Sequence, residues 1–199
     1  MSERRDFIKF LVAAPLAHFS VTALDLEEAA IRTRETLERL AERGQQYQPK
    51  VFTAVEWRTV RVLVDIVIPR DTRSGSATDA MVPEFMDVFM ENRENMRTWM
   101  RTGLTWLDDE CRQRFSKTFI DCTEAQRMAV LDDIAWPRRA RPEMQAGVRF
   151  FNNFRNFTAS GFWSSKMGVD DLQYMGNMPI SQWNGCPAPA LDKLGVRYN

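Results

Sequence analysis

Apolar residues recur at helical spacing along most of the chain, and this pattern predicts about six helices. The first runs from Leu24 to Arg43, with Asp25 as a possible N-cap and Gly44 just beyond its end. The second begins with a capping box, Thr53 to Glu56, and Pro69 ends it. The other four are expected to begin at Pro83, near Asn95, after Thr123 and at Pro142.

Strand signals are weak, because the β-branched runs are short and no turn joins two of them. The polar stretch 70–79 between the second and third helices is expected to be a loop. We therefore expect an all-α fold, an irregular helical bundle formed by residues 24–163.

The pattern changes from Ser164 onward, where glycines and prolines interrupt every possible helix. The segment 164–199 is nevertheless rich in large apolar groups, which a disordered tail usually lacks. We expect a long, irregular, aromatic-rich tail of the same domain that shares a surface with a partner, although packing of individual residues on the chain's own bundle stays open. The candidate interface residues are Trp163, Tyr174, Met175, Trp183 and Pro187.

The N-terminus has the pattern of an export signal. Arg4, Arg5, Phe7 and Lys9, followed by a short apolar stretch, resemble the twin-arginine leader that addresses folded proteins for export. Small residues place a cleavage site after Ala23, with Ala17 as a competitor, so the leader is expected to be residues 1–23. An ordinary amphipathic first helix is the alternative. The leader predicts a periplasmic location.

Composition excludes several classes of function. The 199 residues carry 27 basic and 27 acidic side chains, which gives no electrostatic reason to expect a nucleic acid partner. No apolar run approaches the roughly 20 residues that span a bilayer. His18 is the single histidine, and GxGxxG and GxxxxGK[ST] are absent, so we expect no catalytic site, metal site or cofactor site in this chain.

Three cysteines are left to explain in a chain expected to be exported. Cys111 and Cys122 bracket a predicted helix end and the next helix start, so they are a candidate intrachain disulfide, with two buried thiols as the alternative. Cys186 lies in turn-forming sequence within the tail and is the candidate for an interchain disulfide. A bond from Cys111 or Cys122 to Cys186 stays open.

Other clusters favour structural roles. Asp108, Asp109 and Glu110 could supply an acid–base pair, but neighbouring acids on a helix point in different directions, and a solvated face is expected. The basic run 138–141 is expected in a solvated loop, with phosphate or an acidic partner as the alternative. The phenylalanines around Phe150 are expected in the core rather than in a cofactor pocket.

Three stretches of the chain resemble a known family, the gluconate 2-dehydrogenase subunit 3 family. The first runs from Phe52 through Ile68-Pro69 and Asp71-Thr72 to Gly75 and Asp79-Ala80. The second runs from Gly103-Leu104 through Leu107-Asp108 and Phe119 to Gln126. The third comprises Phe150-Phe151, Gly161-Phe162-Trp163-Ser164-Ser165, Gly168, Tyr174, Gly176-Asn177, Trp183 and Gly185-Cys186-Pro187.

The resemblance implies a non-catalytic small subunit of a membrane-associated dehydrogenase complex. In such a complex a large subunit of the glucose–methanol–choline oxidoreductase class binds FAD and oxidises a sugar or sugar acid, and a cytochrome c, where present, takes the electrons. The small subunit would support folding of the large one and carry it through the twin-arginine route. The alternatives are a stand-alone periplasmic binding module and an enzyme that uses carboxylates such as Asp108 or Asp109.

Overall fold

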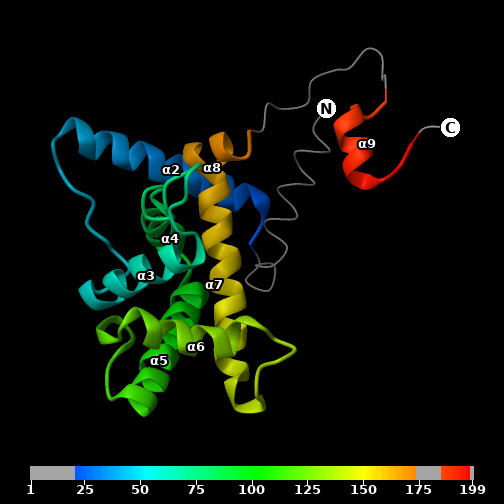
Figure 1. Cartoon of the computed structure of the whole chain (residues 1–199). Coiled ribbons are helices and arrows are strands. Elements are labelled where there is room, and N and C mark those ends of the chain that lie inside the picture. The colour runs from blue at the N-terminus through cyan, green and yellow to red at the C-terminus, as the bar shows by residue number, and fades with distance from the viewer. Residues whose placement is uncertain (1–20, 174–184, 198–199) are drawn as a thin grey trace.

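The computed structural model describes residues 21–173 and 185–197, and Figure 1 shows that these residues fold into helices. The described ranges contain eight α-helices, two 3-10 helices and no strand, which confirms the predicted all-α class. The α-helices are α2 (Ala23–Glu42), α3 (Ala54–Val67), α4 (Val82–Met90), α5 (Glu94–Phe115), α6 (Glu124–Ala135), α7 (Gln145–Ser164), α8 (Lys166–Asp171) and α9 (Ala188–Leu194). The 3-10 helices are η2 (Phe119–Asp121) and η3 (Pro142–Met144).

Three of the helices begin with a capping box in which a threonine is the N-cap. Thr53 caps α3 with Glu56, and Thr123 caps α6 with Gln126, as the sequence predicts. At α2 the cap is Thr22, whose hydroxyl accepts the Asp25 backbone N–H at 3.2 Å while the Asp25 carboxylate accepts the Thr22 N–H. The expectation that Asp25 is the cap was therefore wrong, because Asp25 lies three residues inside and closes the box.

Helix α4 forms the centre of the fold, and all nine of its residues are buried. Helices α2, α3, α5 and α7 surround it, and seven of its nine residues are apolar. Phe85 and Phe89 of α4 pack on Phe157 of α7, with ring centroids 5.7 and 5.3 Å apart. The long α7 packs against α2, α3, α4, α5, α6 and α8 (Figure 1).

Two buried carboxylates lie on α4, and their surroundings differ. Asp87 accepts hydrogen bonds from the Tyr47 hydroxyl at 2.8 Å and from the backbone N–H groups of residues 50, 51 and 52 at 2.8, 2.9 and 3.2 Å. These bonds fasten the segment before α3 onto α4. Glu84 has Oε1 3.5 Å from Arg61, and its buried Oε2 has no hydrogen-bond partner within the described ranges.

Helices α5 and α7 pack through two reciprocal notches. A methyl group on Gly103 of α5 would lie 1.8 Å from the Phe150 ring of α7, and one on Gly147 of α7 would lie 2.3 Å from the Trp106 ring of α5. Each helix thus contributes one glycine notch and one aromatic side chain that fills the opposite notch. Phe150, Phe151, Phe154 and Phe157 are buried, which confirms that they belong to the core.

The segment after Ser164 contains two short helices, so the expectation that glycine and proline interrupt every helix there was wrong for α8 and α9. Ser165 caps α8, because its hydroxyl accepts the Gly168 N–H at 3.0 Å. Pro187 is the N-cap of α9, where a missing backbone N–H costs nothing. Gly168 lies within α8 and Pro189 in the first turn of α9, so both helices accommodate residues that were expected to interrupt them.

Candidate functional site

The loop 69–81, between α3 and α4, is held in place by three aspartates. Asp65 of α3 accepts the Thr78 N–H and hydroxyl at 2.8 and 2.7 Å. Asp71 accepts the N–H groups of residues 73 and 74, and Asp79 accepts the N–H and hydroxyl of Ser76. The backbone hydrogen bonds from residues 74 and 76 lower the pKa values of Asp71 and Asp79 respectively, so the loop carries two ionised carboxylates at neutral pH.

Helix α8 lies against this loop and against the end of α7. Arg73 donates to the Asp171 backbone oxygen at 2.5 Å and forms an ion pair with the Asp171 carboxylate at 3.1 Å. A methyl group on Gly75 would lie 3.0 Å from Met167 Sδ, and one on Gly168 would lie 2.1 Å from the Phe162 backbone oxygen. The two glycines therefore permit the close approach that seats α8.

We define the loop 69–81 together with α8 as the loop–α8 surface. Val169 of α8 and Leu172, its C-cap, are 40% and 55% exposed. Met81, which ends the loop with a positive φ of 59°, is 44% exposed. The chain continues from the end of α8 into residues 174–184. The loop–α8 surface thus carries exposed apolar groups on a backbone held by hydrogen bonds, just before residues 174–184.

The candidate interface residues fall into two groups. Trp163 lies on α7, half-buried, with its ring 4.9 Å from Phe162 in an edge-to-face contact. Pro187 is exposed at the start of α9. Tyr174, Met175 and Trp183 lie outside the described residues. The same holds for the leader residues Arg4, Arg5, Phe7 and Lys9.

Helix α9 buries no residue, although it carries large apolar side chains. Leu194 is 70% exposed, and Val196, just after the helix, is 50% exposed. The apolar side chains at the end of α9 are therefore left exposed within the described ranges.

The cysteines lie in two different environments. Cys111 of α5 and Cys122 at the end of η2 are both buried, whereas Cys186 is exposed just before α9. Burial and the neighbouring Cys122 thiol raise the pKa of Cys111 to about 12, so Cys111 is protonated at neutral pH. Both are free thiols in the structure, and the candidate disulfide between them stays a prediction.

The acidic cluster on α5 is occupied by structural contacts. Asp108 accepts the Phe119 N–H at 2.9 Å, Asp109 pairs with Arg112 at 2.8 Å, and Glu110 pairs with Arg114 at 2.5 Å. Each carboxylate therefore has a helix-stabilising partner. This arrangement gives no support to an enzyme that uses Asp108 or Asp109 as an acid–base pair.

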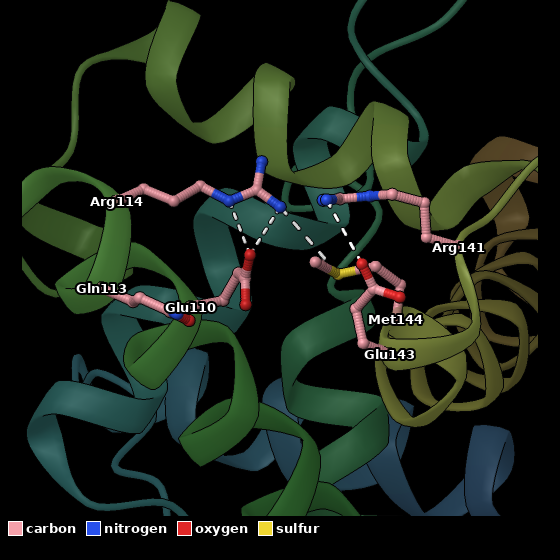
Figure 2. Close-up of a pocket in the computed structure, with 6 residues that line it drawn as sticks. All are labelled: Glu110, Gln113, Arg114, Arg141, Glu143 and Met144. Atoms are coloured by element: carbon pink, nitrogen blue, oxygen red, sulfur yellow. Dashed lines mark hydrogen bonds and ion pairs between the residues drawn. The ribbon is translucent and has the colours of Figure 1, made fainter.

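A pocket of about 420 Å³ that sequence reasoning missed lies beside this cluster (Figure 2). Arg114 reaches Asp133 at 2.7 Å, and Arg141 reaches Glu143 at 3.3 Å, so the charges around the pocket pair with one another. The pocket is lined by Glu110, Gln113, Arg114, Arg141, Glu143 and Met144. The lining residues come from two separate segments, 110–114 and 141–144, so spacing along the sequence could not reveal the pocket.

Neither a metal site nor a membrane span emerges from the described part of the chain. Within residues 21–173 and 185–197, no three His, Cys, Asp or Glu side chains gather in a group that could hold a metal ion. No helix within the same ranges combines the length and apolar character needed to cross a membrane.

Comparison with known proteins gives one match. The sequence model of the family described as gluconate 2-dehydrogenase subunit 3 matches residues 54–185. No curated protein and no solved structure matches the chain. The matched range includes the loop–α8 surface and the two buried cysteines, Cys111 and Cys122.

Proposed function

The chain belongs to the gluconate 2-dehydrogenase subunit 3 family, and we propose that it is the non-catalytic small subunit of a periplasmic FAD-dependent sugar dehydrogenase. The family match is the observation that carries this proposal, since the family is named for a subunit of a dehydrogenase complex. FAD is assigned to a large partner of the glucose–methanol–choline class, because this sequence lacks a GxGxxG motif. A cytochrome c subunit would pass the electrons onward.

The loop–α8 surface and the following tail are proposed as the side that binds the flavin subunit. The exposed apolar groups of α8 and α9 support this assignment, as do the hydrogen bonds that keep the loop rigid before binding. A stable complex would bury a total of about 1,600 Å². Rigid preformed elements bind more tightly because less conformational freedom is lost on association.

Binding supports the partner in two ways. A ligand that binds only the folded form stabilises it, by about 2.7 kcal/mol at a concentration 100 times the Kd. The twin-arginine leader of this chain then addresses the assembled, folded pair for export. Oxidation of Cys186 against a partner cysteine would follow in the periplasm and fix the complex covalently.

The test is co-expression with a candidate flavin subunit, followed by fractionation and capture of this chain. We expect a co-purifying subunit with flavin absorbance in the periplasmic fraction. Replacing Arg4 and Arg5 by Lys should leave both subunits in the cytoplasm, whereas the matched change of Arg34 and Arg39 on α2 should not. A colourless chain recovered alone would contradict the complex and favour a stand-alone binding module.

The covalent link has a separate test. On a non-reducing denaturing gel, Cys186→Ser should separate the two subunits that migrate together in the wild-type complex. Survival of the covalent pair after this change would show that Cys186 does not form the link.

A further inference from the structure

Two thiols meet in the corner where α5 ends and α6 begins. Cys111 on α5 is 0% exposed and Cys122 at the end of η2 is 5% exposed, and both belong to the hydrophobic core. The neighbouring Cys122 thiol is one of the groups that raise the pKa of Cys111. The chain reverses direction between them, so residues eleven apart in sequence become neighbours.

The backbone on each side of the thiols is fixed independently of the sulfur atoms. The Asp108 carboxylate accepts the Phe119 N–H at 2.9 Å. Asp108 lies about one helical turn before Cys111, and Phe119 lies three residues before Cys122. The Cys122 N–H in turn donates to the carbonyls of residues 118 and 119 at 3.1 and 3.3 Å. The segment that carries Cys122 is therefore held against the last two turns of α5, which carry Cys111.

We propose that Cys111 and Cys122 form an intrachain disulfide when the folded chain meets an oxidising environment. In the cell this rests on the export described under the proposed function, whereas the chemistry can be examined in a defined buffer. Cys186 is exposed and lies outside this core.

The oxidant is an external disulfide, either a small molecule or a thiol oxidase. The Cys122 thiolate, the less deeply buried of the two, attacks one sulfur of that disulfide and releases the other as a thiol. The Cys111 thiol then loses its proton, attacks Cys122 in the mixed disulfide and expels the second thiol. Two protons leave the cysteines, two electrons reduce the oxidant, and one sulfur–sulfur bond forms in the protein.

The test is peptide mapping of the full-length chain, alone or in its complex, after full reduction and incubation with glutathione disulfide. Remaining thiols are alkylated in denaturant before non-reducing digestion with trypsin. Cleavage after Arg101, Arg112, Lys117 and Arg127 releases Cys111 in peptide 102–112 and Cys122 in peptide 118–127. We expect these two peptides to be joined, and the link to persist in the matched control Cys186→Ser.

Recovery of both peptides separately, each alkylated, would overturn the proposal. Linkage of either one to the peptide of Cys186 would overturn it as well. If the link forms in the buffer but the protein taken from cells is reduced, the result would support the disulfide and contradict export. Thus failure of the disulfide and failure of the proposed function give different results.

Discussion

Asp87 illustrates how one buried side chain can organise a segment far from it in sequence. Its carboxylate is fully buried and meets four donors from residues 47–52, so the buried charge is matched by hydrogen bonds. Burial and the neighbouring Asp87 carboxylate also raise the pKa of Tyr47, which keeps the phenol a donor. Three of these bonds satisfy backbone N–H groups in a stretch that has no helix or strand to satisfy them.

Asp87→Asn should lower the free energy of unfolding by about 3 kcal/mol, because the amide loses the charge and turns a donor toward other donors. Tyr47→Phe removes one bond of the four and should cost about 1 kcal/mol. Urea unfolding followed by circular dichroism measures both. Asp109→Asn on the exposed face of α5 is the control and should change stability by no more than about 0.5 kcal/mol. Equal effects at positions 87 and 109 would contradict the role assigned to Asp87.

Glu84 should make stability depend on pH in the opposite sense to most carboxylates. Burial raises its pKa above the ordinary 4.5, and its own backbone N–H and Arg61 offset only part of this. The folded state then binds more protons than the unfolded state from about pH 4.5 up to the raised pKa, so stability falls as pH rises through that window.

Glu84→Gln removes this dependence, and its stability relative to wild type should rise as the pH is raised from about 4 to about 8. Thermal unfolding across that range is the measurement. Glu91→Gln is the control of opposite sign. Burial opposes ionisation there too, but Lys50 and Arg32 outweigh it and lower the pKa, so Glu91 stabilises above pH 4.5 and the variant loses stability there.

At the scale of elements, sequence predicts helices wherever a local signal marks their ends. The boxes at Thr53 and Thr123 placed α3 and α6 to within a residue, because capping is a contact between near neighbours in sequence. Helix α8 was missed, since its seat depends on Arg73 and Gly75, nearly a hundred residues away. The paired arginines and acids around the pocket were missed for the same reason, because the pocket joins two segments that are separate in sequence.

Gly168→Ala should unseat α8. The added methyl group would lie 2.1 Å from a backbone oxygen of α7, which cannot rotate away, so α8 must shift at a cost of about 1–3 kcal/mol. If the loop–α8 surface binds the flavin subunit, the affinity of the complex should fall at least tenfold, measured by titration of the purified subunits. Gly44→Ala is the control. Gly44 has a φ of +62°, where alanine is strained, but open space surrounds it, so the change should leave binding unchanged. Unchanged affinity in Gly168→Ala would place the interface elsewhere.

At the scale of the whole molecule, the first described residues bear on where a leader can be removed. Val21 is 5% exposed against the core, and Thr22 caps α2. A cut after Ala23, the site expected from sequence, would remove both. The losses would be about 1 kcal/mol for the cap and about 1.5–3 kcal/mol for a fully buried valine.

We therefore expect the mature protein to retain Val21 and Thr22, as a cut after Ala17 would allow. Intact mass and N-terminal sequencing of the chain from the periplasmic fraction give the answer directly. A mature N-terminus at Leu24 would contradict the expectation. In that case α2 should be frayed at its start, which amide hydrogen exchange would detect.

The reciprocal notches between α5 and α7 also constrain how this family can diverge. Each glycine admits one particular ring, so a larger residue at position 103 is tolerated only with a smaller one at position 150, and the same holds for 147 and 106. Across related sequences, side-chain volumes within each pair should vary inversely, while the two pairs vary independently of each other. Correlated substitutions at these two pairs of positions would then report the packing of α5 on α7.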